Sequence, residues 1–464
     1  MSSAYSRVWP PNYLWHTQLN PEYFPAEHRP ATEEVLTGPT LPQAVPTGFY
    51  MPWLMSLAWL ASNKKKGLQE VFSWKTVDFD YPSHQARDLA LAHGQFYPPD
   101  VLPLGLERDG NRLFITLPRW KKGVPASLTT VDLNSGQRSP LLKPYPDWAW
   151  HNGDCNGITS VFRVALDECG RLWAIDSGVT ELVTSVKRTC PPQILVFDTR
   201  TDKLLFQYKI PMAQVPAGSL FTNIAVEVMD TCQDTFAYVS DVFRYGIVVF
   251  SLRNNRSWRV DHPYFYPDPL HSRYDIDNIK FTWNDGIFGI TMSPRDITGR
   301  RYLFFHPLSS FREFHIDTMM LQNETFAKRA DEMMKLLGEE RRTDRGHAAG
   351  SSMDRNGVLF YNLISLSAVG CWNSRLPHYP ETQGIVETNN ITLSFPNDLK
   401  VDKEPIQRLW VLSNRLHRYL YSKLDPSDVN FRVMTMPVDE AVKGTPCDDS
   451  YVMPPRRTGK CYGS

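Results

Sequence analysis

Asparagine and aspartate side chains recur at the start of segments that we expect to be the innermost strands of a repeated sheet. These segments are "YPPDVLPL", "DCNGITSV", "LFTNIAVEV", "IDNIKFTW", "HAAGSSM" and "SFPNDLKV". Five of the six carry Asn or Asp at this place: Asp100, Asn156, Asn223, Asn278, and Asn397 with Asp398. If the segments converge on one axis, these amides and carboxylates form a polar ring that can bind a small polar ligand.

Two other interpretations of the same side chains stay open. Asn and Asp also cap turns and bind backbone groups at the starts of strands, without any ligand. A ring of oxygen atoms can also bind calcium, but calcium usually takes several carboxylates and this ring is mostly amide. We therefore expect no metal site.

Aromatic residues lie close to these segments in the sequence. Phe221 precedes Asn223, and "HPYFYPDP" brings Phe265 into the connection towards the fourth unit. Aromatic rings beside amides suit a small aromatic ligand, which gains stacking area and a few orienting hydrogen bonds. Phe221, Asn223 and Phe265 are therefore candidate ligand-binding residues, although most aromatic residues of a large β protein belong to its core.

Motifs for nucleophilic, metal or nucleotide chemistry are absent from the chain. There is no G-x-S-x-G, H-E-x-x-H, Walker, Rossmann or EF-hand pattern, and we expect no cofactor. If the chain is an enzyme, a general acid or base must come from side chains brought together by the fold. The candidates at the expected ligand site are Asp100, Asp398 and His347.

A recurring strand–turn–strand unit must position these residues. It is clearest in "DECGRLWAIDSG", and altered forms are "LERDGNRLFITLPRW", "VMDTCQDTFAYVSDV", "SSMDRNGVLFYNLIS" and "VDKEPIQRLWVLSNR". Six expected third strands follow: "LTTVDL", "ILVFDT", "IVVFSL", "YLFFHPL", "AVGCWN" and "RYLYSKL". Four strands repeated six times predict an all-β, six-bladed β-propeller, since radial stacking covers both faces of each sheet. Two stacked sandwiches would not explain this recurrence.

Two segments complete the predicted propeller, which spans residues 70–450. "VFSWKTVDFDYP", Val71 to Pro82, is expected to add an outer strand to the last blade and to close the ring. Residues 319–345 have apolar side chains at helical spacing, which predicts a short helical insert between blades four and five. This helix either covers one end of the propeller or binds a partner.

The two ends of the chain differ from the propeller. Residues 1–50 are Pro-rich and lack periodicity, so we expect them to be disordered or a non-native extension, with translation beginning at Met51. Residues 51–62, "MPWLMSLAWLAS", have the length of the apolar part of a signal peptide. A buried strand or a membrane anchor is the alternative. Residues 451–464 read as a flexible tail.

Other features agree with a secreted, extracellular protein that has no stable membrane insertion after signal cleavage. Asn255, Asn323 and Asn390 lie in glycosylation sequons. The seven cysteines fit no zinc pattern and predict disulfides, with Cys461 as the odd thiol. We pair Cys371 with Cys447. The four remaining cysteines allow three pairings, and they are Cys155, Cys169, Cys190 and Cys232.

The chain has 50 Lys and Arg residues together and 50 Asp and Glu residues together. It therefore has no overall positive charge that would favour binding to nucleic acid.

Several long motifs resemble those of the Yellow and major royal jelly protein family of insects. They are "VFSWKTVDFDYP", "LFITLPRWKKGVPASL", "ITSVFRVALDECGRLWAIDSG", "CPPQILVFDT", "FAYVSDV", "LSAVGCWN" and "RLWVLSNR". The resemblance covers roughly Val71 to Cys447 and implies a secreted six-bladed propeller. By analogy with amine-binding members, it also implies ligand contacts at Phe221, at Ser367 before the Gly-Cys-Trp-Asn stretch, and at Thr382, where such members usually have Asn.

The resemblance implies more than one function. The first is a secreted protein of the melanin pigmentation and cuticle pathway that binds a catechol, an indole or a biogenic amine at the propeller channel. The alternative is an enzyme, a dopachrome isomerase, which moves a proton within a quinone substrate. A metal-dependent lactonase-like hydrolase is a second alternative, and it rests on fold analogy alone.

Overall fold

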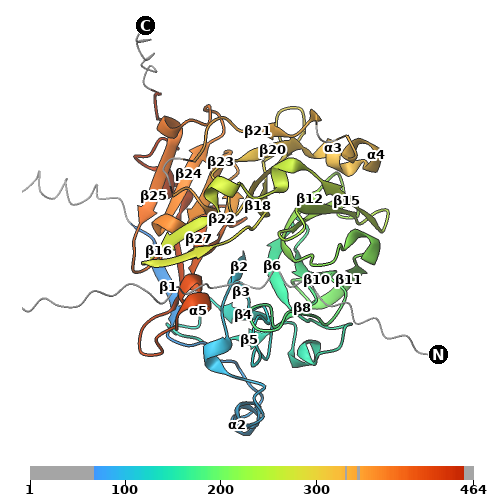
Figure 1. Cartoon of the computed structure of the whole chain (residues 1–464), viewed down its shortest axis with the longest axis vertical. Coiled ribbons are helices and arrows are strands. Elements are labelled where there is room, and N and C mark those ends of the chain that lie inside the picture. Colours follow the sequence, from blue (N-terminus) through green and yellow to red (C-terminus); the bar gives the residue numbers. More distant parts are fainter. Residues whose placement is uncertain (1–66, 330–331, 342–344, 454–464) are drawn as a thin grey trace, which may run out of the picture. The chain divides into compact units, whose positions relative to one another are not determined.

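The fold is described by a computed structural model that covers residues 67–329, 332–341 and 345–453. Six four-stranded antiparallel sheets are arranged around a common axis, which confirms the predicted six-bladed propeller (Figure 1). The proposed N-terminal extension, the candidate signal peptide, Ala330, Cys461 and most of the tail lie outside the described residues. Within the described part, no helix is long and apolar enough to span a bilayer.

The blades follow one another along the chain. From the axis outwards, blade one has β2 (Gly105–Asp109), β3 (Arg112–Thr116), β4 (Leu128–Asp132) and β5 (Lys143–Pro144). Blade two has β6 (Val161–Leu166), β7 (Arg171–Asp176), β10 (Gln193–Asp198) and β11 (Lys203–Lys209). Blade three has β12 (Phe221–Val228), β13 (Thr235–Asp241), β14 (Gly246–Ser251) and β15 (Arg256–Asp261). In the same direction, blade four has β18 (Ile287–Met292), β19 (Tyr302–Pro307), β20 (Phe314–Asp317) and β21 (Lys335–Leu336). Blade five has β22 (Ala348–Met353), β23 (Val358–Leu363), β24 (Ala368–Asn373) and β25 (Gln383–Thr388). Blade six has β26 (Pro396–Val401), β27 (Arg408–Ser413), β28 (Phe431–Pro437) and β1 (Gln69–Trp74).

Smaller elements join or cover the blades. The two-stranded pairs are β8 (Val179–Thr180) with β9 (Lys187–Arg188), and β16 (Arg273–Ile276) with β17 (Ile279–Thr282). The α-helices are α2 (His84–Ala92), α3 (Thr318–Gln322), α4 (Glu324–Ala327), α5 (Leu416–Tyr421) and α6 (Val438–Val442). The 3₁₀ helices are η2 (Pro98–Asp100), η3 (Trp148–His151), η4 (Met212–Gln214), η5 (Pro263–Phe265), η6 (Pro269–His271), η8 (Ile364–Leu366) and η9 (Pro380–Thr382).

The ring is closed by the innermost strands and by β1, the first strand of the described residues. Each of β2, β6, β12, β18 and β22 packs against the inner strand of the next blade, and β26 packs back against β2. The predicted closing strand is β1, which pairs antiparallel with β28 in the register Trp74 to Phe431. Blade six therefore joins the two ends of the propeller, and few edges are left exposed.

In blade two the outermost strand is much less buried than the two strands nearest the axis. All residues of β6 and β7 in blade two are buried, while β11 at the outer edge has none that is fully buried. The inner strands are covered on both faces because a neighbouring blade packs on each side. The mostly apolar sequence of β6 in blade two is typical of a strand that is buried on both faces.

Blade four differs from the sequence-based strand assignment. "YLFFHPL", expected as its third strand, is the second strand β19, and its inner strand β18 lies in "NDGIFGITMSP". "IDNIKFTW", expected as the inner strand, forms the separate β16–β17 hairpin. The residues of β16 alternate between exposed and buried, whereas the true inner strand β18 begins with four consecutive buried residues.

Two helical segments also refine the prediction. The insert forms α3 and α4, which lie in the connection between β20 and β21, so it belongs to the outer edge of blade four rather than following that blade. "RYLYSKL", expected as a third strand, begins inside helix α5 and overlaps its last four residues. Leu416 and Tyr419 are buried three positions apart, which is the spacing of one helical face.

Three disulfides link the described cysteines. Cys371 on β24 pairs with Cys447 after α6, as predicted, and this bond ties the end of the chain to blade five. The pairings left open by the sequence are Cys155 with Cys190 and Cys169 with Cys232. The second of these joins the turns that connect the inner two strands of blades two and three.

Candidate ligand site beneath the hairpin

The axis of the propeller is filled by a buried ion pair. Arg163 on β6 lies 3.0 Å from the Oδ1 atom of Asp398 on β26, and both side chains are 1% exposed. Its guanidinium also donates to the carbonyl oxygen of Asn397 at 2.6 Å and lies 4.8 Å from the ring centre of Phe288. These partners come from blades six and four, so the Arg163 side chain crosses the axis at this level.

Glycine at two inner strands leaves room for this ion pair. A Cβ atom on Gly350 would lie 3.0 Å from both the Nη1 atom of Arg163 and the Oδ1 atom of Asp398. A Cβ on Gly105 would lie 3.3 Å from the Cγ atom of Arg163.

The polar ring that the sequence predicted forms only in part. Asn156 is exposed in a loop and Asn278 lies at the tip of the hairpin, away from the blade strands.

Three predicted ligand-binding residues have structural roles in the blades. Phe221 is fully buried in the packing between blades two and three. The Asn223 amide donates to the carbonyl oxygen of Phe288 at 3.0 Å, and its oxygen accepts from the N–H of Ile224. Phe265 is fully buried against Phe305, with 5.2 Å between ring centres.

Asp100 and Asp398, two predicted acid–base candidates, lie in separate environments. Asp398 accepts hydrogen bonds from the N–H groups of Leu106 and Leu399 in addition to its ion pair. Asp100 lies 3.7 Å from Lys121, and burial raises the pKa of its carboxyl. The structure therefore does not bring the two aspartates together.

A cavity with a volume of about 630 Å³ is lined by residues of the β16–β17 hairpin and contains predicted site residues. We call it the hairpin cavity. It brings together His347 and Ser367, with Asn390 at its edge. Its lining residues are Arg273, Asp275, Ile276, Asp277, Asn278, Arg345, His347, Ser365, Leu366, Ser367 and Asn390. The wall thus combines charges of both signs with hydroxyl groups and two apolar side chains.

A second cavity of about 510 Å³ lies at the outer strands of blade one. It is lined by residues such as Arg112, Ser135 and Lys143 and contains none of the predicted site residues. The hairpin cavity is therefore the candidate ligand site.

His347 is held rigidly in the wall of the hairpin cavity. Its Nε2 atom lies 2.9 Å from the carbonyl oxygen of His271, and its Nδ1 atom lies 2.8 Å from the hydroxyl of Ser365. A carbonyl can only accept, so Nε2 carries the hydrogen and the Ser365 hydroxyl donates to Nδ1. Burial lowers the pKa of His347 to about 4, and the ring is therefore neutral at neutral pH.

Aromatic rings continue from His347 across the face of the propeller. The ring of Tyr274 on the hairpin stacks on His347 with 3.9 Å between ring centres, and Tyr274 stacks on Phe281 at 5.0 Å. Phe281 in turn packs against Trp283 and against Tyr421 of α5. The hairpin therefore contributes one wall of the cavity and at the same time packs on elements of blade six.

Ser367 and Thr382, the two contacts implied by family resemblance, lie at opposite ends of the β24–β25 pair. This pair has the register Ala368 to Thr388 at one end and Trp372 to Gln383 at the other. The Thr382 hydroxyl donates within η9, 3.0 Å from the carbonyl oxygen of Tyr379. The residue beside Ser367 is Asn389, whose N–H donates to the Ser367 carbonyl oxygen at 2.9 Å.

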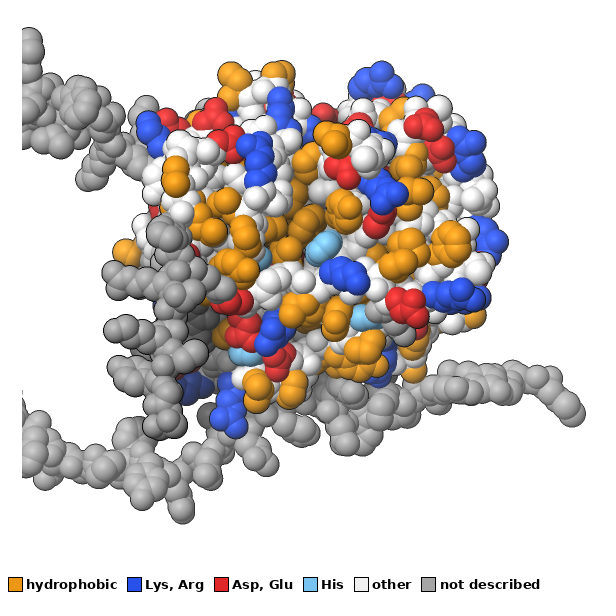
Figure 2. Space-filling model, turned by 90° about the horizontal axis from the view of Figure 1, so that it is seen from above, with side chains coloured by type: hydrophobic (Ala, Val, Ile, Leu, Met, Phe, Trp, Pro, Cys, Tyr) orange, Lys and Arg blue, Asp and Glu red, His pale blue; other side chains and the backbone are white. Residues whose placement is uncertain are grey.

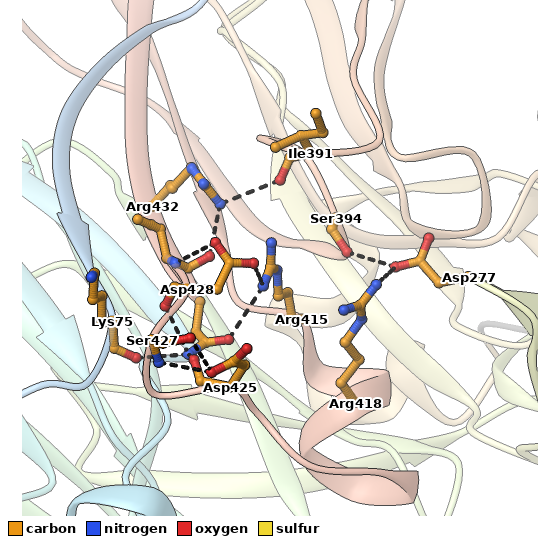
Figure 3. Close-up of polar contacts among 12 residues, drawn as sticks. Lys75, Asp277, Ile391, Ser394, Arg415, Arg418, Asp425, Ser427, Asp428 and Arg432 are labelled. Atoms are coloured by element: carbon orange, nitrogen blue, oxygen red, sulfur yellow. Dashed lines mark hydrogen bonds and ion pairs between the residues drawn. The ribbon is translucent and has the colours of Figure 1, made fainter.

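The hairpin is fastened at its tip by the Asp277 cluster, which consists of Asp277, Ser394, His417 and Arg418. Figure 3 shows Asp277 with Ser394 and Arg418. One carboxylate oxygen of Asp277 accepts from Ser394 at 3.1 Å and from Arg418 at 3.0 Å. His417 lies 3.1 Å from the same oxygen, and burial lowers its pKa to about 4. Asp277 and Asn278 both have positive φ, as a two-residue hairpin turn requires.

Replacing Asp277 by asparagine (D277N) is expected to loosen the hairpin. Asparagine tolerates the left-handed backbone, so the change removes mainly the charge that Arg418 and His417 contact. Since hydrogen bonds to charged groups contribute about 1.5–3 kcal/mol and this cluster is partly exposed, we expect amide exchange in residues 273–282 to accelerate about tenfold. Hydrogen exchange with mass spectrometry measures this. D275N, which changes an exposed carboxylate of the same hairpin, is the control. Equal protection from amide exchange in D277N and D275N would contradict the role of the Asp277 cluster in fastening the hairpin.

Some residues of this region were missed from the sequence. Ser365 lies two positions before Ser367 and gave no signal of its own. Asp285, in "NDG" directly before the true inner strand of blade four, fits the expected pattern of Asn or Asp at strand starts. It was missed because "IDNIKFTW" took its place in the assignment. Burial raises the pKa of Asp285 to about 7.

The charges of the surface are mixed. On the uncovered part of the face in Figure 2, Lys and Arg side chains are interspersed with Asp and Glu side chains and with apolar ones. Among the described residues, no group of three or more His, Cys, Asp or Glu side chains is placed to hold a metal ion.

Comparison with known proteins places these features in context. The family model described as "Major royal jelly protein" matches residues 159–447. Protein yellow of Drosophila subobscura is 41% identical over 82% of this chain and 67% of its own length. Dopaminechrome tautomerase of Drosophila melanogaster is 40% identical over 83% of this chain and 85% of its own length. Among solved structures, the calcium-binding protein regucalcin of Agrobacterium tumefaciens is 11% identical, covers 73% of this chain and 91% of its own, and has a TM-score of 0.42.

Proposed function

The chain belongs to the Yellow and major royal jelly protein family, and from this premise we propose that it is a secreted protein of the melanin and cuticle pathway that binds a small aromatic molecule in the hairpin cavity. The ligand classes are a catechol, an indole or a biogenic amine. The three disulfides and the three glycosylation sequons support an extracellular location.

The observation that carries this proposal is the composition of the hairpin cavity. Its volume of about 630 Å³ lies in the range of small-molecule sites. Leu366 and Ile276 offer apolar contact to a flat ring, and Arg273 and Arg345 offer cations to catechol or quinone oxygens. The exposed carboxylate of Asp275 suits an ammonium group. A ligand with an aromatic ring, oxygen atoms and an amine matches all three features.

Ser367 provides the test of binding. We expect dopamine or serotonin to bind the purified protein, and the glycine variant S367G to weaken this binding about three- to tenfold, since one hydrogen bond contributes about 0.5–1.5 kcal/mol. Glycine suits the positive φ of Ser367, so the change removes the hydroxyl without backbone strain. Calorimetry measures the affinities, with S135A, a serine of the second cavity, as the control. Equal affinities in S367G and the unchanged protein would place the ligand elsewhere.

A second candidate function is the conversion of dopaminechrome. It is favoured by the similarity to the Drosophila melanogaster dopaminechrome tautomerase and by the Ser365–His347 pair in the cavity wall. In the first step of this reaction a ring C–H bond breaks, its electron pair enters the ring, and a quinone oxygen gains a proton from solvent water, to which the base later returns the proton taken from the ring. The Ser365 hydroxyl would accept the ring proton while it passes its own to Nδ1 of His347, and Arg345 would stabilise the oxygen.

Replacement of His347 by glutamine (H347Q) distinguishes turnover from binding. If the pair transfers the proton, loss of dopaminechrome absorbance should slow about 10²- to 10⁴-fold, while KM changes little. D100N tests another sequence-based candidate in the same assay. A rate equal to the uncatalysed reaction in the unchanged protein would leave binding as the function. A loss confined to D100N would move the acid or base away from the hairpin cavity.

A further inference from the structure

One glycosylation sequon lies at the rim of the hairpin cavity. Asn390 is exposed and lines the cavity, and it is followed by Ile391 and Thr392. The preceding residue Asn389 is anchored to the wall, since its N–H donates to the carbonyl oxygen of Ser367 at 2.9 Å. The position of the Asn390 side chain is therefore coupled to the residue that we expect to contact the ligand.

The sequon is held in a defined turn. The Asn389 side-chain oxygen accepts from the N–H groups of Ile391 and Thr392 at 2.9 and 3.0 Å. Arg432 donates to the carbonyl oxygen of Ile391 at 3.3 Å (Figure 3), and the Ser413 hydroxyl donates to that of Thr392 at 2.6 Å. None of these bonds uses the Asn390 side chain, so its amide is presented outwards on a fixed backbone.

The other two sequons lie elsewhere. Asn255 is exposed in the turn between β14 and β15 of blade three, and Asn323 caps helix α4 through its side-chain oxygen. Neither residue lines the hairpin cavity. A glycan on either of them would increase solubility, whereas a glycan on Asn390 would stand directly at the opening of the cavity.

We propose that Asn390 carries an N-linked glycan and that this glycan restricts the hairpin cavity to free small molecules, excluding the same aromatic groups when they are attached to a protein or polymer. The donor is an oligosaccharide on a dolichyl diphosphate. The bond between the first sugar carbon and the diphosphate breaks, a bond from that carbon to the Asn390 nitrogen forms, and the amide loses one proton. This inference rests on the proposed function for the identity of the ligand, but the restricted access can be measured without it.

The first measurement is the occupancy of Asn390. The protein is secreted from insect cells, and its glycopeptides are analysed by mass spectrometry. T392S keeps the sequon, while T392A abolishes it and leaves Asn390 itself in place. We expect a glycan on Asn390 in the unchanged protein and in T392S, and none in T392A. An unmodified Asn390 in a preparation that carries glycan on Asn255 would overturn the proposal.

The second measurement is access to the cavity. S367C introduces a thiol into the wall, and its reaction with a small maleimide is compared with that of a polymer-linked maleimide, in a C461S background. With T392S, we expect the polymer-linked reagent to react about tenfold or more slowly than with T392A, while the small reagent reacts at similar rates with both. Equal rates for the polymer-linked reagent would overturn the proposal. Because neither reagent is the ligand, failure to bind dopamine would count against the proposed function alone.

Discussion

Replacing Arg163 by methionine (R163M) is expected to lower the free energy of unfolding by about 3–5 kcal/mol, which is the typical cost of removing one partner from a buried ion pair. Methionine has a similar length and keeps apolar contact with Phe288. It leaves the Asp398 carboxylate buried at the axis, where only the N–H groups of Leu106 and Leu399 remain as partners.

A double-mutant cycle separates the ion pair from other effects of the substitution. D398N should also be strongly destabilising, since it leaves the Arg163 guanidinium without its counter-charge. The double variant R163M/D398N removes both charges, and it should lose at least about 2 kcal/mol less than the sum of the two single variants. Urea unfolding measures all four proteins. Additive losses would show that Arg163 and Asp398 stabilise the axis independently.

Acidification is expected to destabilise the propeller steeply between about pH 6.5 and pH 4. Burial lowers the pKa of His151 to about 3 and of His347, His378 and His417 to about 4. Each of these histidines is neutral in the folded protein, while in the unfolded chain it takes up a proton below its ordinary pKa of about 6.5. The unfolded state therefore binds more protons in this range, and stability is lost as the pH falls.

Carboxyls whose pKa is raised by burial oppose this trend, and they include Asp100, Glu107, Asp354 and Asp285. Burial raises the pKa of Asp285 to about 7, so the folded protein binds this proton first and gains stability as the pH falls. The four histidines and Asp285 by themselves give a net difference of about three protons, which corresponds to roughly 3–4 kcal/mol per pH unit near pH 5.5. This slope would exhaust the stability of an ordinary domain within a few pH units.

Urea unfolding at a series of pH values tests this expectation. H151Q should reduce the slope by about 1.4 kcal/mol per pH unit, since it removes one of the buried groups. H93Q replaces an exposed histidine in the connection after α2 and serves as the control. A free energy of unfolding that stays constant between pH 7 and pH 5 would contradict the neutral, buried state of these histidines.

The propeller itself was predictable because its signals are local and repeated. Each blade contains strands with buried side chains and turns with Gly, Asp or Asn, and these patterns recur along the chain. The closing strand was also predicted from the sequence, in "VFSWKTVDFDYP" before blade one, and the structure confirms it. The predicted Cys371–Cys447 pair is confirmed as well.

The candidate site was predictable only in part. His347 was selected from its position in the sequence and Ser367 from the family resemblance, and both line the hairpin cavity. Phe221, Asn223 and Phe265 were selected by the same kind of argument, but they pack within and between blades. The type of a residue and its position along the chain do not reveal whether its side chain faces a cavity or a neighbouring sheet. A shift of one residue in the register of a strand turns every side chain of that strand to the opposite face.

The sequence by itself determined the number of blades, their order and the family, because these depend on short-range patterns that repeat. Only the tertiary structure decided what fills the axis and what encloses the cavity. Arg163 and Asp398 are 235 positions apart, and Asp277 meets Arg418 across 141 positions. Such contacts depend on how six sheets pack around one axis, and no local pattern in the chain specifies which two distant residues will meet there.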